Sequence, residues 1–553
     1  MPTLAPTNFN IIVSVLGGWI SVFGLVSYLL KENFYLSEAL ISLLAGLVFS
    51  PHAANFVRPL EYAGSEENLN AITLYFTRLV LGVQLVLAGV QLPSRYLKKE
   101  WKPLALLLGP IMTAMWIITS LLVWGLVPNL PFLHALAIGA CVTPTDPVLS
   151  NVIVKGRFAD HNVPKDLQKI IIAESGANDG LGYPFLFFAL YLIKYIGDGG
   201  VNEQGGAGLA IGLWFGETWG YTILLSVVYG AVVGWIAKEL LHFCEEHKFV
   251  DRESFLVFAF SLALFITGTC GMIGSDDILA CFIAGNVFTW DDWFRLETLD
   301  EVHMLLNVTI FMWYGAVCPW HSFVANSIIP IYRLVPLGIL ILLFRRLPFI
   351  LAFYKKIPQI NGFQQAVFMG FFGPIGCSAI FYLYVTLEFI DTLNPDEGNV
   401  ARWDVAHLKE SVSVLVWFMV ICSVVVHGLS IPLGKFGFYL PRTISRTLST
   451  SEDLPFRIGA RITPRSRSRD GTATHTSADS RSVSHTGITV DATELVESRD
   501  NLEAGSKTPE LVSGSPYSTP SPTLPSRTIR FPDEASSASK EFQDPKRDAT
   551  TTS

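Results

Sequence analysis

Two short stretches of the sequence place carboxylates among apolar residues. Residues 143–147 read Thr-Pro-Thr-Asp-Pro, and residues 174–179 read Glu-Ser-Gly-Ala-Asn-Asp. A carboxyl group removed from water favours its neutral form, so it can bind and release a proton near cellular pH. Once ionised, the same group is a hard oxygen ligand for an alkali cation. A site for which H⁺ and Na⁺ compete can couple the movement of one ion to that of the other.

The first stretch predicts a broken helix. Pro144 and Pro147 each remove a backbone donor and displace the carbonyl four residues earlier. Backbone of this kind survives at membrane depth only where it is buried or lines a wet cavity. We therefore expect the freed carbonyls, the hydroxyls of Thr143 and Thr145, and the carboxylate of Asp146 to be oxygen ligands for Na⁺ or K⁺. A plain proline kink packed against its neighbours is the alternative.

The second stretch places Glu174 and Asn178 on one helical face, with Asp179 about 100° round the helix. A carboxylate at mid-membrane costs a few kcal/mol, which favours a functional role. We predict that Asp179 binds both the proton and the cation, with Asn178 beside it. The alternative is a carboxylate buried in a stabilising ion pair, and it fits Glu174 better than Asp179.

Four other charged residues are supporting candidates. Asp276 and Asp277 open the short, glycine-rich ninth apolar stretch, where they lie either in a solvated loop or in a funnel that attracts cations. Arg345 and Arg346 are candidate counter-charges for Glu174, or they extend to the cytoplasmic interface.

The composition indicates the elements that must hold these residues. Half of the residues are hydrophobic and 16% are charged, against about 25% in soluble domains, and the mean hydropathy is +0.43. Stretches of about 17–25 apolar residues, the length that spans a bilayer, recur at 11–30, 36–50, 70–92, 103–126, 132–153, 170–194, 218–241, 254–273, 276–290, 302–327, 331–354, 361–390 and 408–433. An all-α integral membrane protein with thirteen spans follows, or twelve if one of the short stretches does not cross.

Basic residues set the predicted orientation, because cytoplasmic loops are enriched in them. They follow the third, fifth, eleventh and last stretches, at Arg95, Lys98, Lys99, Lys102, Lys155, Arg157, Lys165, Lys169, Lys355, Lys356, Lys435, Arg442 and Arg446. The N-terminus is therefore expected outside and the C-terminus in the cytosol.

The chain divides by composition into four parts. Residues 1–10 are a short extracellular N-terminus, 11–433 the transmembrane domain, and 434–450 a cytosolic juxtamembrane segment. Residues 451–553 form a tail rich in Ser, Thr, Pro and acidic residues, which we predict to be disordered. Its Arg465–Arg469 stretch is a candidate target for a kinase or a weak membrane contact, unless the tail is merely solvated.

A second interruption lies in the twelfth stretch. Gly373, Pro374 and Gly376 occur there, at the position in the second half that corresponds to residues 143–147 in the first. Paired breaks of this kind in inverted repeats indicate the binding site of a transporter, because half-helix ends carry partial charges that hold ions. We therefore expect two inverted repeats with crossed discontinuous helices.

The paired motifs resemble the monovalent cation/proton antiporter superfamily. Residues 143–148 followed by 174–180, with the Gly-Tyr-Pro-Phe after Asp179 and Ser-Asp-Asp at 275–277, look like its fungal plasma-membrane Na⁺(K⁺)/H⁺ antiporter branch. The resemblance implies a plasma-membrane homodimer that extrudes cytosolic Na⁺ and Li⁺, and also K⁺, in exchange for external H⁺. Salt tolerance and cation and pH homeostasis would be its physiological roles.

By position, the resemblance implies that Asp179 is the ion- and proton-binding aspartate and Asp146 the aspartate of the unwound helix. Asn178, Thr143 and Thr145 match motif positions, and Asp276 and Asp277 match an acidic pair needed for transport. One departure concerns Glu174. Relatives often carry Gly-Leu-Arg-Gly in the twelfth span, where residues 373–376 read Gly-Pro-Ile-Gly, so its partner must come from elsewhere, such as Arg345 or Arg346.

Other functional classes fit the sequence less well. An aspartyl protease that paired Asp179 with Asp277 would require a Gly-x-Gly-Asp motif, which the sequence lacks. No stretch resembles the repeated filter or charged ring of a channel, whereas a symporter of an organic solute stays open. The seven scattered cysteines form no metal-ligand spacing. We expect a secondary transporter and not an enzyme, with no cofactor and no nucleic-acid partner.

Overall fold

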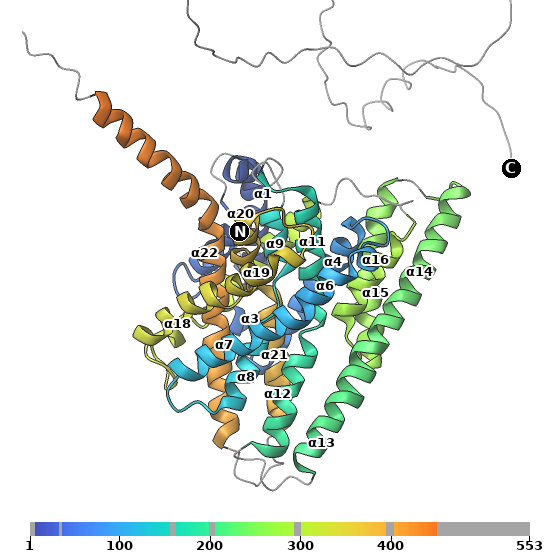
Figure 1. The fold of residues 1–553 in the computed structure, drawn as a ribbon, viewed down its shortest axis with the longest axis horizontal. Coiled ribbons are helices and arrows are strands. Elements are labelled where there is room, and N and C mark those ends of the chain that lie inside the picture. Colours follow the sequence, from blue (N-terminus) through green and yellow to red (C-terminus); the bar gives the residue numbers. More distant parts are fainter. Residues whose placement is uncertain are drawn as a thin grey trace, which may run out of the picture. The chain divides into compact units, whose positions relative to one another are not determined.

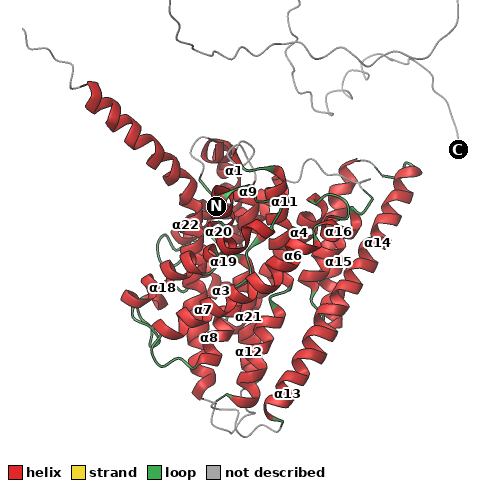
Figure 2. Cartoon of the chain, in the orientation of Figure 1, coloured by secondary structure: helices red, strands yellow, loops and turns green. Residues whose placement is uncertain are grey.

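The computed structural model describes residues 6–32, 36–154, 162–197, 205–250, 252–291, 300–393 and 403–450. These residues contain helices and loops but no strand (Figure 2). They belong to one compact unit that ends at Arg457. The predicted tail at 451–553, including Arg465–Arg469, lies outside the described residues.

Helices account for nearly all of the described chain. Its α-helices are α1 (Asn8–Glu32), α2 (Glu38–Phe49), α3 (Pro59–Ala63), α4 (Glu66–Gln91), α5 (Tyr96–Lys99), α6 (Trp101–Leu106), α7 (Met112–Leu126), α8 (Phe132–Cys141), α9 (Pro147–Val154), α11 (Lys165–Gly180), α12 (Tyr183–Ile196), α13 (Gly206–Leu213), α14 (Leu225–Glu246), α15 (Arg252–Ile273), α16 (Asp277–Phe288), α17 (Asp300–Val317), α18 (Ile331–Phe344), α19 (Leu347–Phe353), α20 (Phe363–Phe371), α21 (Cys377–Asp391) and α22 (Trp403–Thr450). Two π-helical segments, Leu107–Ile111 and Trp214–Leu224, join α6 to α7 and α13 to α14, and 3₁₀ turns occupy Trp320–Phe323 and Tyr354–Lys356.

Each of the thirteen predicted stretches overlaps a helix, which confirms an all-helical fold. Six helical segments in the described part of the chain are long and apolar enough to cross a membrane: Asn8–Val26, Glu66–Gln91, Trp101–Leu126, Gly206–Glu246, Ile331–Lys356 and Asp404–Ser430. Five further apolar helices of 10–17 residues accompany them. The chain is thus a multi-pass membrane protein, while the number of crossings, their orientation and the inverted repeat stay predictions.

Prolines account for the main differences from the predicted boundaries. The tenth stretch, predicted to reach residue 327, ends as α17 at Val317, because Pro319 follows and cannot continue a helix. The sixth stretch bends between α11 and α12, where Pro184 occupies the first turn of α12. Proline is tolerated there because first-turn N–H groups have no partner within the helix.

Glycines bring the supporting helices close together. A Cβ on Gly46 of α2 would lie 3.0 Å from the Cα of Gly315 of α17, and a Cβ on Gly285 of α16 would lie 3.1 Å from the Cα of Gly89 of α4. Small residues allow such close backbone approach between membrane helices. Figure 1 shows α4, α14, α15 and α16 as neighbours, and they pack on one another. This packing fixes the position of the N-terminus of α16, where Asp276 and Asp277 lie.

Candidate ion-binding site

The first predicted break is present between α8 and α9. Helix α8 ends at Cys141, and α9 begins at Pro147. Proline is well tolerated as the first residue of a helix, because the N–H that it lacks would have no partner within the helix there. Asp146 precedes α9, and its Oδ1 accepts a hydrogen bond from the Val148 N–H at 3.0 Å. An aspartate in this position caps the unpaired amides of a helix N-terminus. The sequence therefore breaks the helix where the two prolines predict.

The second break lies between α20 and α21 and contacts the first. The Asp146 N–H donates to the Pro374 carbonyl at 3.0 Å, and Asp146 Oδ2 accepts from the Cys377 N–H at 2.8 Å. Gly376 is required here because a Cβ at that position would overlap the Asp146 carboxylate. A single buried carboxylate thus caps both α9 and α21, and each of its two oxygens accepts a backbone amide.

Arg345 closes the opposite ends of the two breaks. Its guanidinium donates to the carbonyls of Val142 and Gly373, and lies 3.3 and 3.4 Å from the carbonyls of Thr143 and Pro144. The side chain is fully buried. The freed carbonyls of the first break, which the sequence predicted as cation ligands, are therefore taken by this arginine. Arg345 serves the C-terminal ends of α8 and α20 and is not the partner of Glu174.

Glu174 is instead paired with Arg346. Arg346 Nη1 lies 2.5 Å from Glu174 Oε1, and Nη2 lies 2.7 Å from Oε2, in a two-pronged ion pair. Both side chains are buried, and Arg346 Nε also donates to the Met369 carbonyl at 3.0 Å. Such pairing satisfies a buried carboxylate completely. Of the two alternatives for Glu174, the structure has the ion pair.

A polar network joins the first break to α11. Asn178 Nδ2 donates to Thr145 Oγ1 at 2.7 Å, and Asn178 Oδ1 accepts from the Thr145 N–H at 3.2 Å. The hydroxyl of Ser175 lies 3.1 Å from those of Thr145 and Ser150. Thr143 stands apart, because its hydroxyl donates to the Gly139 carbonyl of the preceding helix α8 at 2.7 Å.

Asp179 differs from every carboxylate above. It is 1% exposed, and neither of its carboxylate oxygens has a hydrogen-bond partner. The Ser378 hydroxyl lies close to this carboxylate, but without the geometry of a hydrogen bond. Tyr382 donates to the backbone carbonyl of Asp179, which fixes the helix turn and leaves the side chain free. Buried polar atoms are almost always paired, so this carboxylate is poised for a proton or a cation.

Asp276 and Asp277 do not lie in a solvated loop. They are 0% and 2% exposed. Asp276 caps α16 by accepting from the Leu279 N–H at 3.0 Å, and Asp277 Oδ2 accepts from Arg78 Nε at 2.7 Å. Since Asp277 is held by an arginine, it is not available as the second aspartate of a protease.

The sequence analysis missed Arg78, Ser378 and Tyr382. Arg78 carried a usable signal, since it is the only charged residue within the apolar stretch 70–92, and charged residues in such stretches are functional by default. Ser378 and Tyr382 carried none, because a serine and a tyrosine in an apolar helix are common.

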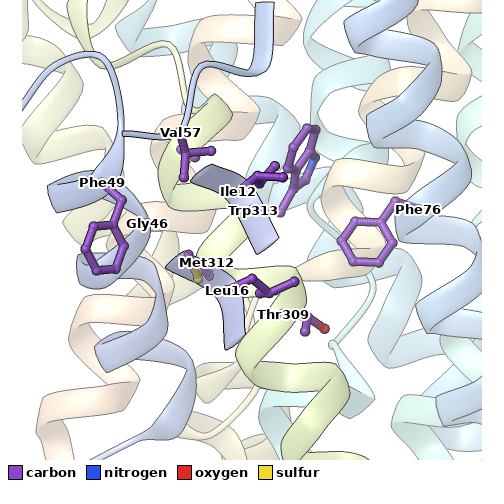
Figure 3. A pocket seen from close by; sticks show the side chains of 10 residues that line it. Ile12, Leu16, Gly46, Phe49, Val57, Phe76, Thr309, Met312 and Trp313 are labelled. Carbon is purple, nitrogen blue, oxygen red and sulfur yellow. The ribbon is translucent and has the colours of Figure 1, made fainter. Parts of the chain in front are cut away.

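The described residues hold one large apolar cavity elsewhere, of about 280 Å³ (Figure 3). It lies between α1, α2, α4 and α17, and its lining is Ile12, Leu16, Gly46, Phe49, Val57, Phe76, Thr309, Met312, Trp313 and Ala316. No ionisable side chain lines it, so it is separate from the ion-binding site.

Comparison with known proteins identifies the family. Residues 20–433 match the family described as sodium/hydrogen exchanger, transmembrane. The chain belongs to this family. Sodium/hydrogen exchangers are secondary transporters, so the family assignment agrees with the prediction of a transporter and not an enzyme.

Fungal members of the exchanger family are similar over most of this chain. Na⁺/H⁺ antiporter 2 of Zygosaccharomyces rouxii is 34% identical over 459 residues, which cover 81% of this chain and 55% of that protein. A Na⁺/H⁺ antiporter of Saccharomyces cerevisiae is 34% identical over 461 residues, covering 81% and 46%. The chain thus spans about half the length of these relatives. A Na⁺/H⁺ antiporter of Schizosaccharomyces pombe is 30% identical over 456 residues, which make up 79% of this chain and 94% of that protein.

A solved exchanger has the same fold. The sodium proton antiporter MjNhaP1 of Methanocaldococcus jannaschii superposes with a TM-score of 0.53, covering 77% of this chain and 98% of that one, at 16% identity. At this identity the likeness concerns the fold alone.

Proposed function

We propose that this chain is a secondary active antiporter that exchanges Na⁺ for H⁺, and that Asp179 binds both ions in turn. The observation that carries the proposal is the state of its carboxylate, which is buried beside the crossed helix breaks with both oxygens unpaired. The fungal relatives named above are Na⁺/H⁺ antiporters, which supports the choice of ions.

The neighbours of Asp179 suggest a division of roles. When Asp179 is protonated, its buried site is neutral; when it is ionised, a bound Na⁺ restores neutrality, which a buried carboxylate requires. Ser378, with its unpaired hydroxyl, is a further oxygen ligand. Asn178 and Thr145 hold the break against α11. Asp146 contributes negative charge to the site, and its two oxygens, each of which accepts a backbone amide and keeps further acceptor capacity, are additional ligands for a proton or a cation.

The wider physiological role rests on the resemblance to the fungal branch. We propose that Li⁺ and K⁺ are also carried, that cytosolic cations leave in exchange for external H⁺, and that the exchange serves salt tolerance and cation and pH homeostasis. The same resemblance supports a homodimer in the plasma membrane with a cytosolic C-terminal tail, open to kinases or other regulatory proteins.

Proteoliposomes loaded with a pH-sensitive dye test the function. With an acidic interior, external Na⁺ is expected to drive H⁺ out and dequench the dye, and Li⁺ and K⁺ in turn give the selectivity. A response that requires an organic solute would indicate a symporter. No response to any of the three cations from correctly folded protein would refute the proposal.

Asp146→Asn is expected to reduce both stability and transport. The asparagine amide has one acceptor oxygen, so its NH₂ group would face the N–H of either Val148 or Cys377. Leaving a buried amide unpaired costs about 1–3 kcal/mol. Thermal unfolding in detergent should show a lower melting temperature, and the liposome assay a weaker apparent Na⁺ affinity. Wild-type values of both would contradict the capping role.

A further inference from the structure

Arg78 is the only arginine or lysine within α4, a helix that lies against α15, α16 and α21. Its Nε donates to Asp277 Oδ2 at 2.7 Å. The Arg78 side chain is 27% exposed, whereas that of Asp277 is 2% exposed. The guanidinium therefore lies between Asp277 and the surface.

A single hydrogen bond holds the arginine to Asp277. One terminal nitrogen, Nη2, rests against Gly271 of α15, where any side chain would collide with it. A single Nε bond is a weaker hold than the two-pronged pair that Arg346 makes with Glu174. Glu388, an exposed residue of α21, is close enough for its charge to interact with that of Arg78, although the ion pair in the structure is with Asp277.

The ion pair lies on a line of carboxylates that leads away from Asp179. Asp276, next to Asp277, is fully buried, and its Oδ2 has no hydrogen-bond partner. It interacts electrostatically with Asp179. Helices α11 and α16 touch here, since a Cβ on Gly180 would lie 2.8 Å from the Cα of Leu279. Of these carboxylates, Asp179, Asp276 and Asp277 are buried, and Glu388 is exposed.

We propose that Arg78 is a positioning residue that closes the external route to Asp179 by its ion pair with Asp277. With the orientation predicted from the basic loops, the third and ninth stretches begin outside, so Arg78, Asp276 and Asp277 lie on the external side of Asp179. Release of Asp277 exposes two carboxylates, one of them already unpaired, that attract a cation or a proton toward Asp179. Glu388 receives Arg78 in the open state, because α21 begins at the helix crossing and lies against α4.

Cys270 provides a reporter that does not depend on transport. It is fully buried, it adjoins Gly271, and it interacts electrostatically with both Arg78 and Asp277. Cells that express the full chain would be treated from outside with a membrane-impermeant maleimide. Losing one partner of a hydrogen-bonded charge pair shifts such equilibria strongly, so Arg78→Gln should speed Cys270 labelling by about tenfold or more.

Matched variants make the result specific. Arg78→Lys keeps the charge and should label more slowly than Arg78→Gln, and Cys270→Ser should remove the added label. Asp277→Asn breaks the same pair from the other side and should also speed labelling, which covers the case in which Arg78→Gln does not fold. Glu388→Gln should slow labelling in the wild-type background, since the open state loses its acceptor.

Three outcomes would overturn the proposal. The rate of Cys270 labelling could stay unchanged in both folded Arg78→Gln and Asp277→Asn, or it could be equal in Arg78→Lys and Arg78→Gln. The added labelling could also occur only from the cytosolic face. The proposal rests on the antiport function, but the two fail separately. Wild-type protein without cation-driven H⁺ flux would refute antiport while leaving the labelling result intact.

Discussion

Asp179→Asn is expected to abolish cation-driven H⁺ flux in proteoliposomes while leaving folding and surface amount unchanged. Asparagine has the same shape as aspartate, but its amide group binds no proton at cellular pH and carries no negative charge to hold a cation. The wild-type carboxylate makes no hydrogen bond in the structure, so the substitution removes none. We expect a loss of at least about 100-fold, as for removal of a group on which the reaction depends.

Asp166→Asn is the matched control, because it makes the same chemical change on the same helix. Asp166 lies at the start of α11, with its side chain 78% exposed. Its variant should transport like wild type. If Asp179→Asn retained substantial Na⁺-driven flux, or if Asp166→Asn lost it equally, the assignment of the shared site to Asp179 would be wrong.

Glu174→Gln and Arg346→Gln are expected to be the most destabilising single substitutions near the site. Each leaves the other charge buried without its partner, at a typical cost of about 3–5 kcal/mol. The double variant Glu174→Gln/Arg346→Gln should recover part of this loss, because it leaves no unpaired charge. Thermal unfolding of purified protein in detergent would give the three melting temperatures.

The exposed pair of Lys169 and Asp166, on the same helix as Glu174, is the control. Lys169→Gln should change stability by less than about 1 kcal/mol, as is usual for surface ion pairs. If the double variant were as unstable as the sum of the two single variants, Glu174 and Arg346 would contribute independently and not as a pair.

The helices and their breaks were predictable because local sequence decides them. Apolar stretches long enough to cross a bilayer can only be helical there. Pro144, Pro147 and Pro374 interrupt those helices whatever surrounds them. The burial of Asp179 also followed from its place in an apolar stretch, whereas its role in ion binding stays a prediction.

The partners of the charged residues were not predictable, because they come from distant segments. Arg345 and Arg346 are adjacent in sequence, yet one binds the carbonyls of the two breaks and the other binds Glu174. The turn between α18 and α19 points the two side chains apart, and no local pattern reveals such a turn. The capping role of Asp146 was likewise not predictable, since one of the amides that it accepts comes from the distant helix α21.

The crossing of the two broken helices is electrically self-balanced. Each helix end carries about half an elementary charge, so Asp146 offsets the two positive ends and Arg345 the two negative ones, while Glu174 and Arg346 offset each other. Because these pairs are in direct contact, they travel together in any displacement of the crossing. Membrane voltage would then act only on Asp179 and the ion that it binds, which together are neutral with either a proton or Na⁺. A cycle that exchanges one Na⁺ for one H⁺ should therefore run at a rate independent of the membrane potential.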